Sequence, residues 1–430
     1  MNILCLNNGF NKQGGFMKIS LIILLLLSSC TQIIEENKIN EDDKEIVEEQ
    51  IEISFYPPVE NNPANTELTP FFNGQTRVSG IKTETNYSVT VLSEGLESPW
   101  GIDMLPNGTL IITEKSGTIR LVENGNVSNK IFVTNKIETS GQGGLLDVLI
   151  SPDFDTNGIL FFTLAEKTNQ GSLTAVAKAK LDLNTQTISN FEIIYRATPY
   201  FSGNNHYGSR IVMDNNGNLF VSTGDRQSLV TRPNAQTLDN GHGKILHIDI
   251  NGNALSSNPF YTNSNVHVEI YSLGHRNVQG LAIHPITGDL WANEMGPQGG
   301  DELNRIESGK NYGWPVISYG EEYSGFPIGD GMSVKDGLEQ PIYYWDPVIA
   351  PAGMVFYNSD SIKEWKNNLF ISGLRGQHIA RLLIKDNLVI GEERIAHDLG
   401  ERFRDITVGN DGALYTITDS GKIYRIGKEE

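Results

Sequence analysis

Short apolar runs separated by turns rich in glycine, asparagine and aspartate repeat along the chain from Tyr87 onward. In each copy an apolar run, a turn and a second run are followed by another turn and a third run. Short runs bounded by turn residues are typical of antiparallel strands, and long amphipathic helical patterns are scarce. The copies centre on residues 101–122, 145–166, 209–225 with 243–250, 281–296 with 301–306, 354–384 and 403–426.

These six copies predict an all-β fold, a six-bladed β-propeller of four-stranded antiparallel blades that spans residues 86–430. The period is irregular because insertions of different length separate the copies. A twisted sandwich is the alternative, but it does not explain why the copies share their turn chemistry. The inner strands of the blades are predicted to be plain apolar core.

In a propeller, the loop that enters the innermost strand of each blade and the loop after its second strand open on the same face. Residues spread over most of the chain are therefore expected to meet at one mouth. The first set of loops contributes Trp100, Gln142, His206, Arg276, Asn277, Pro351, Arg402 and Arg404. The second set contributes Lys115, Asp225, Met295, Gly296, Pro297, Arg375 and Asp419.

Residues 1–30 have the pattern of a secretory signal with a lipoprotein box. Met17 and a lysine precede the apolar run ISLIILLLLSSC, which ends at Cys30. We interpret Met17 as the true start and Cys30 as the lipidated first residue of the mature chain, with an ordinary cleaved signal peptide as the alternative. Thr31 follows the cysteine in place of aspartate, which favours retention in the outer membrane. The expected location is the cell envelope, facing the periplasm or the cell surface, with membrane contact only through the lipid on Cys30.

Residues 31–85 are predicted to be a tether. Nine acidic side chains and two lysines lie within residues 31–54, and a stretch rich in proline and asparagine follows. Much of the formal net charge of −19 is therefore local. No basic stripe that could displace the counterions of nucleic acid is present, so nucleic acid is not an expected partner.

Four arginines of the predicted mouth, at positions 276, 375, 402 and 404, contrast with the acidic balance of the chain. Guanidinium groups that gather at one opening favour an anionic ligand, and their planar fork suits carboxylates. The alternative is that each arginine pairs with a neighbouring acid such as Asp405 or Asp225.

His206 is the candidate base at this mouth. A neutral imidazole is suited to taking a proton from a hydroxyl near neutral pH, and Asp225 is placed to reach the same face. His275 is a rival, but its neighbour Arg276 would lower its basicity.

The loop that starts at Gly296 and Pro297 is rich in oxygen atoms suited to calcium, through backbone carbonyls and the carboxylates of Asp301 and Glu302. A glycine-rich phosphate loop, a serine nucleophile elbow and a cysteine–histidine zinc cluster are all missing from the sequence.

With these residues in place, the chain resembles the soluble quinoprotein sugar dehydrogenases, and specifically the aldose sugar dehydrogenase branch that uses pyrroloquinoline quinone (PQQ). The resemblance covers about Tyr87 to Ile426. Its motifs, in chain order, are GQGGLLDVLISPDF, HYGSRIVMDNNGNLFVSTGD, AQTLDNGHGKILHID, GHRNVQGLAIHP, NEMGPQGGDELNRI, NYGWP and RFRD.

The resemblance implies a role for each matching residue. His206 would remove the proton of the sugar C1 hydroxyl as hydride passes to PQQ, and Asp225 would orient that histidine. Arg276 would lie near the quinone carbonyl. The further PQQ contacts implied are Asn277 and Gln142, with Arg375, Arg402 and Arg404 on the cofactor carboxylates. The calcium ligands implied are the carbonyls of Gly296 and Pro297 at the cofactor, and Glu302 with the carbonyl of Tyr312 at a second, structural site.

The sequence therefore predicts an oxidoreductase that converts an aldose to its lactone with PQQ and calcium and passes electrons to an unknown acceptor. Arg375 stands where the glucose-oxidising members have lysine, and the loop from Tyr319 to Tyr344 does not match closely, so the identity of the sugar is not implied. Two other functions stay open: a non-catalytic binding propeller and a calcium-dependent lactonase.

Overall fold

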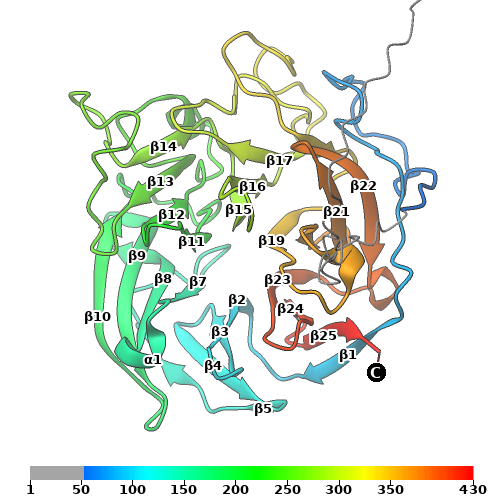
Figure 1. Cartoon of the computed structure of the whole chain (residues 1–430). Coiled ribbons are helices and arrows are strands. Elements are labelled where there is room, and N and C mark those ends of the chain that lie inside the picture. The colour runs from blue at the N-terminus through cyan, green and yellow to red at the C-terminus, as the bar shows by residue number, and fades with distance from the viewer. Residues whose placement is uncertain (1–52, 430) are drawn as a thin grey trace, which may run out of the picture. The chain divides into compact units, whose positions relative to one another are not determined.

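In the computed structural model, which describes residues 53–429, the strands form six antiparallel sheets arranged in a ring (Figure 1). Each sheet is a blade whose first strand faces the centre of the ring. The predicted six-bladed propeller is thus confirmed. Met17, Cys30 and the rest of the predicted signal and acidic stretch up to residue 52 lie outside the described residues.

The first three blades follow each other along the chain. The first comprises β2 (Pro99–Met104), β3 (Leu110–Glu114), β4 (Thr118–Glu123) and β5 (Asn126–Val127), and β6 (Ile131–Phe132) also pairs with β4. The second comprises β7 (Leu145–Ile150), β8 (Ile159–Thr168), β9 (Gly171–Asp182) and β10 (Thr187–Arg196). The third comprises β11 (Ile211–Met213), β12 (Leu219–Ser222), β13 (Lys244–Ile248) and β14 (Ile270–Leu273).

The other three blades complete the ring. The fourth comprises β15 (Val278–Ile283), β16 (Leu290–Glu294), β17 (Asp301–Ile306) and β18 (Tyr343–Trp345). The fifth comprises β19 (Pro351–Phe356), β20 (Leu369–Gly373), β21 (Ile379–Lys385) and β22 (Leu388–Ile395). The sixth comprises β23 (Phe403–Val408), β24 (Leu414–Thr418), β25 (Ile423–Lys428) and β1 (Tyr87–Ser93).

The sixth blade closes the ring by joining the two ends of the propeller. Its outer strand β1 comes from the start of the domain and pairs with β25 at the end of the chain, from Tyr87 opposite Lys428 to Ser93 opposite Ile423. This pairing covers the edge of β25, which would otherwise present unpaired backbone groups.

The apolar core lies between the blades. Six clusters of buried residues each combine side chains from two neighbouring sheets, as where Ile111 of β3 packs with Phe162 of β8. Both faces of each sheet are therefore covered, which explains why the strands read as nearly continuous apolar runs.

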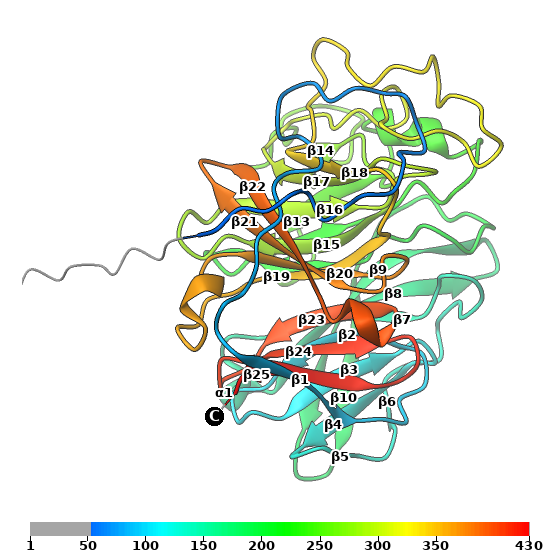
Figure 2. The ribbon, with the colours of Figure 1, turned by 90° about the vertical axis from the view of Figure 1, so that its right-hand side faces the viewer.

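The described part of the predicted tether, residues 53–85, packs along the outside of the ring (Figure 2). Tyr56 and Gly80 pair with each other, and Gly80 also pairs with Glu392 of β22. The backbone N–H groups of Asn65 and Thr66 donate to the Asp346 carboxylate at 2.8 and 3.0 Å. This corrects the tether interpretation for residues 53–85: paired backbone and buried side chains fix a stretch whose composition suggested a free linker.

Short helices occur only in connections of the described chain: α1 (Phe154–Asn157) and the 3₁₀ helices η1 (Arg232–Gln236), η2 (Lys363–Trp365) and η3 (His397–Leu399). Within residues 53–429, none of these is long and apolar enough to cross a membrane.

Candidate active site

A cavity of about 240 Å³ opens at one end of the ring, where the loops before the inner strands meet the loops after the second strands. Residues from all six blades line it, as the loop geometry predicts. They are Trp100, Lys115, Gly141, Gln142, Leu146, Tyr207, Gly208, Asn277, Gln279, Met295, Ala350, Leu374, Arg402 and Arg404.

His206 and Asp225 form a buried pair in the third blade, directly beside the cavity-lining residues Tyr207 and Gly208. The imidazole Nδ1 lies 2.7 Å from Asp225 Oδ1, and Asp225 Oδ2 accepts a hydrogen bond of 2.8 Å from Trp314 Nε1. Because the carboxylate accepts from Nδ1, the hydrogen of a neutral imidazole sits there and Nε2 keeps its lone pair.

The backbone at His206 is held in an unusual conformation. Its φ of 46° lies in the left-handed region, which non-glycine residues rarely adopt, and its N–H donates to Gln142 Oε1 at 2.8 Å. Gly208 follows with φ of 63°, where a Cβ would meet the Thr223 backbone at 2.6 Å. Only glycine therefore lets this loop approach β12 closely enough to present His206.

Burial and charge set the protonation of the pair. Burial, followed by the nearby charge of Arg276, lowers the pKa of His206 to about 4 despite the opposing effect of Asp225. Burial raises the pKa of Asp225, but the hydrogen bond and charge of His206, with the charge of Arg276, outweigh it and lower that pKa. At neutral pH the imidazole is neutral and the carboxylate is ionised, the state in which Nε2 can accept a proton.

Arg276 and Asn277 extend the site into the fourth blade. The Arg276 guanidinium lies 5.2 Å from the centre of the Trp314 ring and donates to the carbonyls of Met295 and Gly296, both at 2.8 Å. Its Nε is buried and has no hydrogen-bond partner among the described residues. Asn277 Oδ1 accepts from the Gly208 N–H at 3.1 Å, which ties the third and fourth blades together at the cavity.

Opposite these residues the cavity has a cationic wall formed by Lys115, Arg402 and Arg404. Both guanidinium groups pair with the same carboxylate, Asp419, at 2.8 and 2.9 Å. Burial and the charge of Arg404 lower the pKa of Lys115, whose Nζ donates to the Gly141 carbonyl at 2.8 Å. Three cations against one carboxylate leave a positive excess that suits an anionic ligand.

Arg375 does not join this wall. Its exposed side chain lines a separate hollow on the outer rim of the fifth blade, while its neighbour Leu374 lines the cavity. The role in holding a cofactor carboxylate that the resemblance implied for Arg375 therefore has no support in this geometry. Sequence position alone identifies the loop but not the direction of the side chain.

Three of the four predicted calcium ligands, Gly296, Pro297 and Glu302, line one small space together with Arg276. The Gly296 carbonyl accepts from the Arg276 guanidinium. Burial and then the charge of Glu294 raise the pKa of Glu302 well above its usual range, and Asn304 donates to it at 3.1 Å. Among residues 53–429, no group of three or more histidine, cysteine or acidic side chains is arranged to hold a metal ion.

The rival histidine, His275, lies in the interior instead of at the mouth. It is fully buried, its Nδ1 lies 2.9 Å from Glu294 Oε1, and its ring stacks on Tyr312 with centroids 4.9 Å apart. Both of its nitrogens are engaged, because Nε2 lies 2.8 Å from Ser272 Oγ.

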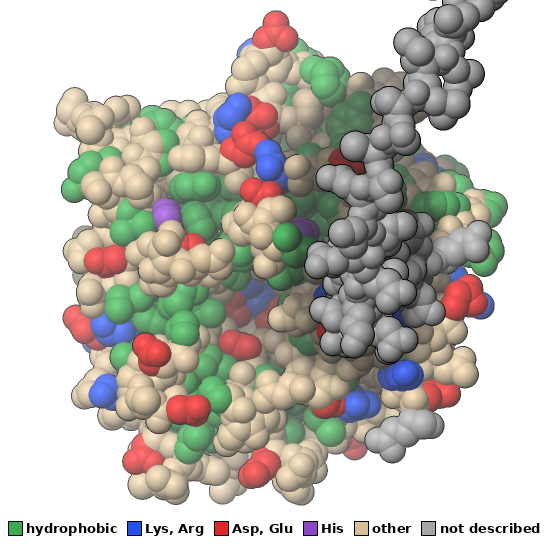
Figure 3. All heavy atoms as spheres, viewed as in Figure 1, with side chains coloured by type: hydrophobic (Ala, Val, Ile, Leu, Met, Phe, Trp, Pro, Cys, Tyr) green, Lys and Arg blue, Asp and Glu red, His purple; other side chains and the backbone are tan. Residues whose placement is uncertain are grey.

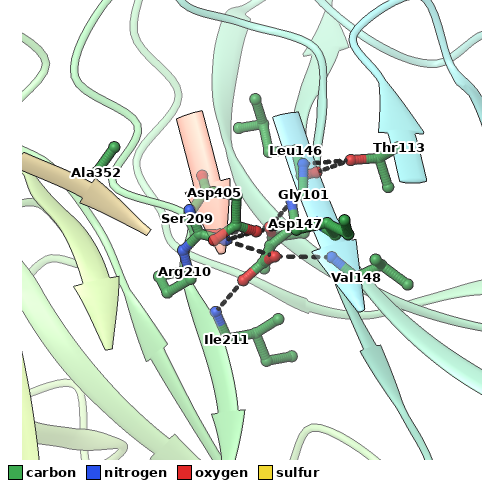
Figure 4. Close-up of polar contacts among 12 residues, drawn as sticks. Gly101, Thr113, Leu146, Asp147, Val148, Ser209, Arg210, Ile211, Ala352 and Asp405 are labelled. Atoms are coloured by element: carbon green, nitrogen blue, oxygen red, sulfur yellow. Dashed lines mark hydrogen bonds and ion pairs between the residues drawn. The ribbon is translucent and has the colours of Figure 1, made fainter. Parts of the chain in front are cut away.

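A buried ionic cluster beneath the cavity was missed by the sequence analysis and corrects the expectation of a plain core. Arg210 donates to Asp147 at 2.8 Å and to Asp405 at 2.7 Å, on the axis where the inner strands meet (Figure 4). It also lies 4.4 Å from the centre of the Trp100 ring and donates to the Gln279 carbonyl at 3.0 Å, so the cluster supports two cavity-lining residues. Burial is the main cause that raises the pKa of Asp147 to about 7.

A signal for this cluster exists in the sequence. The third residue of five inner strands is glycine or aspartate, namely Gly101, Asp147, Gly280, Gly353 and Asp405, and Arg210 stands directly before β11, the inner strand of the third blade. The glycines make room for the charged side chains, because a Cβ at Gly101 would lie 2.8 Å from Asp147 Oδ1 and one at Gly353 would lie 1.7 Å from Asp405 Oδ1. An alignment of the inner strands therefore shows three glycines and three charged residues at one level of the ring.

A six-bladed ring with a buried imidazole–carboxylate pair and a cationic wall at one mouth defines a propeller with an enzyme-like site. The chain belongs to the glucose/sorbosone dehydrogenase family, whose model matches residues 96–425. The resemblance drawn from the motifs is thereby confirmed, and the relatives support an oxidoreductase of the PQQ-type sugar dehydrogenases.

Three relatives illustrate the match. The aldose sugar dehydrogenase YliI of Escherichia coli is 37% identical over 345 residues, which cover 79% of this chain and 92% of that protein. The solved apo form of the soluble aldose sugar dehydrogenase from Escherichia coli superposes with a TM-score of 0.76 at 37% identity, covering 80% of this chain and 100% of that one. The PQQ-bound aldose sugar dehydrogenase from Streptomyces coelicolor gives a TM-score of 0.66 at 25% identity, covering 81% and 100%.

Proposed function

We propose that the protein is a quinoprotein oxidoreductase that oxidises the C1 hydroxyl of an aldose to the lactone with PQQ as cofactor. The observation that carries the proposal is the neutral, carboxylate-held His206 beside a cavity whose opposite wall is cationic. A base for a hydroxyl and a place for an anionic cofactor thereby lie at one opening.

The residues present fit PQQ, which carries three carboxylates and a quinone. Arg402 and Arg404, with Lys115 beside them, would hold carboxylates, and the cavity amides of Gln142 and Asn277 would hold ring oxygens. The buried Nε of Arg276 is a donor without a protein partner, as expected where a ligand acceptor completes the site. When bound, the quinone supplies the two-electron acceptor for the hydride of the sugar.

His206 is proposed to accept the C1 hydroxyl proton at Nε2. Asp225 fixes the imidazole tautomer and stabilises the positive charge that forms, while Trp314 holds the second carboxylate oxygen in place. Arg276 adds a buried positive charge next to the site, which favours negative charge developing on a nearby oxygen.

Calcium belongs to the proposal in a supporting role. The half-buried Glu302 lies opposite the buried Glu294 on the neighbouring strand, and a divalent cation near Glu302 and the carbonyl of Tyr312 would relieve their repulsion. The Gly296 carbonyl is already an acceptor for Arg276, so we assign no catalytic step to a metal held by Gly296 and Pro297.

The lactonase alternative is less favoured by the same geometry. A catalytic metal in that chemistry needs side-chain carboxylates, and the described residues that line the cavity include no aspartate or glutamate. Asp225 is committed to His206 and Trp314. A pure binding propeller gives no reason for this buried pair.

The test is reconstitution of the metal-free, cofactor-free protein. We expect PQQ with calcium to give aldose-dependent dye reduction, and His206→Asn to lose about 10²-fold or more of kcat with PQQ still bound. His247→Asn is the control, since His247 pairs with Asp214 in the outer part of the third blade. Turnover that survives in His206→Asn would exclude His206 as the base, and failure of the protein to bind PQQ would exclude the function.

We further propose that the mature chain is a lipoprotein of the cell envelope, on the basis of the sequence around Cys30. Labelled palmitate should enter the wild-type protein and not Cys30→Ala. Equal labelling of both would contradict this.

A further inference from the structure

A second hollow of about 430 Å³ lies outside the cavity, on the rim of the fifth blade. One side is formed by the docked N-terminal segment around Glu60 and Asn62, and the other by the loop from Arg375 to His378. Arg394 of β22 and His397 of η3 complete it. None of these residues lines the cavity described above.

His378, which lines this hollow, has a buried hydrogen-bond acceptor without a partner within residues 53–429. The side chain is 1% exposed, and its Nδ1 lies 2.7 Å from the Gly376 carbonyl, so Nδ1 carries the hydrogen. Its Nε2 is buried and has no partner among the described residues. Burial, followed by the charge of Arg394, lowers the pKa of the imidazole to about 3, which keeps Nε2 an acceptor at neutral pH. An unpaired buried acceptor is costly, so a ligand that donates a hydrogen bond fits here.

Two guanidinium groups face the same hollow with unused donors. Arg394 is held by Glu60 at 2.6 Å, and its buried Nε makes no hydrogen bond in the described chain, although it lies 3.8 Å from Glu392 Oε1. Arg375 is exposed, and within residues 53–429 its guanidinium makes no hydrogen bond or ion pair. The carboxylate of Glu60 is occupied by Arg394 and by the Asn62 N–H at 2.8 Å, so it does not neutralise Arg375. A carboxylate is the anion that such planar donors prefer.

We propose that this hollow binds a small hydroxycarboxylate of the sugar-acid class. The ligand carboxylate would accept from Arg375 and from Arg394 Nε, and a ligand hydroxyl would donate to His378 Nε2. The three side chains call for a carboxylate and a donating hydroxyl in one small molecule. The ring-opened form of an aldose lactone is a hydroxycarboxylate of this class, so the site would also bind the product of the enzyme. The link to the product rests on the proposed function, whereas the binding of a hydroxycarboxylate does not.

The test is calorimetric titration of the cofactor-free full chain with gluconate. Sorbitol, which has the hydroxyls without the carboxylate, and acetate and sulfate, which offer no donating hydroxyl at neutral pH, are the matched probes. We expect saturable gluconate binding at least tenfold tighter than that of any of the three. Because no cofactor or turnover is involved, a failure of the catalytic proposal would leave this result unaffected.

Four variants locate the binding. Arg375→Ala, at an exposed position, and His378→Phe should each weaken gluconate at least tenfold. Lys385→Ala, which removes a positive charge from the far end of β21 in the same blade, should change nothing. Arg404→Ala, in the main cavity, should also leave the affinity unchanged.

Three results would overturn the proposal: equal affinity for sulfate and gluconate, loss of gluconate binding in Arg404→Ala in place of Arg375→Ala, or no saturable gluconate binding. If His378→Phe does not fold, the Arg375→Ala and Arg404→Ala variants decide.

Discussion

At the scale of single residues, the chemistry of this protein depends on a few side chains that are charged or titratable and yet buried. His206 is kept neutral by burial, Asp225 is kept ionised by its hydrogen bonds, and Arg210 is paired on the axis. Each is costly to bury alone, and each is compensated by named partners. Substitutions at these positions therefore report on the partners as well as on the residue.

Arg210→Met is expected to destabilise the protein strongly. It leaves Asp147 and Asp405 buried without their shared cation, and breaking such a pair costs about 3–5 kcal/mol. Arg425→Met, which removes a part-exposed partner of Asp411, should cost only about 0–1 kcal/mol. Chemical denaturation of both variants measures the difference. Equal stability of Arg210→Met and wild type would contradict the assigned role of the axial cluster.

Acidification should destabilise the protein through its buried imidazoles. The pKa values of His206 and His242 are lowered to about 4 by burial, so the unfolded chain binds a proton that the folded chain does not between pH 6.5 and 4. In that window the free energy of unfolding falls by about 1.4 kcal/mol per pH unit for each imidazole. Buried acids with a raised pKa, such as Asp301, have the opposite effect, because they make the folded state more stable as the pH falls. The contribution of one imidazole is therefore measured by comparing a variant with the wild type.

His242→Gln isolates one share of this pH dependence. Its stability measured by urea denaturation should fall less than that of the wild type between pH 6.5 and 5. Parallel curves for the two proteins would show that His242 is not protected from protonation in the folded state.

At the scale of elements, the repeat of strands and turns was enough to predict the six blades and the loops that meet at the mouth. Gln142, His206, Asn277 and Arg404 meet there because each sits at a fixed place in its blade. Side-chain direction was not predictable in the same way: Arg375 follows the same rule of position yet points into another hollow. The backbone path in each loop decides this, and it depends on long-range contacts that a repeat pattern does not contain.

Residues 53–85 were misread for a related reason. Proline and asparagine are typical of linkers, but here the backbone pairs with the propeller through contacts more than 250 residues away, such as Thr66 with Asp346. Composition describes the segment by itself and carries no information on a hydrogen-bond acceptor elsewhere in the chain. The docking of such a segment is therefore predictable only when the residues that it contacts are known.

Asp346→Ala is expected to release this segment. Asp346 accepts from the N–H groups of Asn65 and Thr66 and from the Thr66 hydroxyl at 2.9 Å, and losing the acceptor costs about 1–3 kcal/mol. Amide hydrogen exchange of residues 65 and 66 should accelerate, while Asp360→Ala, at an exposed ion pair, should leave it unchanged. Unchanged exchange in Asp346→Ala would mean that other contacts hold the segment.

At the scale of the whole molecule, the closed ring is what brings distant residues to one opening. Blade-to-blade packing is apolar, and the outer surface seen in Figure 3 mixes acidic and basic side chains among polar and apolar ones. The ring is sealed by a single strand pair, β1 with β25. The geometry of the mouth therefore depends on an element that lies far from it.

Removing that strand should compromise the ring. A chain that begins at residue 95 lacks β1 and leaves the edge of β25 unpaired, so we expect lower thermal stability and self-association. A chain that begins at residue 53 retains β1 and should unfold like the full protein. Size-exclusion chromatography and thermal unfolding compare the two; identical unfolding would contradict the role of β1 in closure.

The central claim is that the cationic wall and the His206 pair serve one bound cofactor, and absorption spectroscopy of the PQQ-reconstituted protein tests it most directly. PQQ should bind with a stoichiometry of one, bind at least tenfold more weakly to Arg404→Ala, and show the spectral change of reduction when an aldose is added to the wild type but not to His206→Asn. A protein that takes up no PQQ, or one in which His206→Asn reduces it as fast as the wild type, would contradict the account.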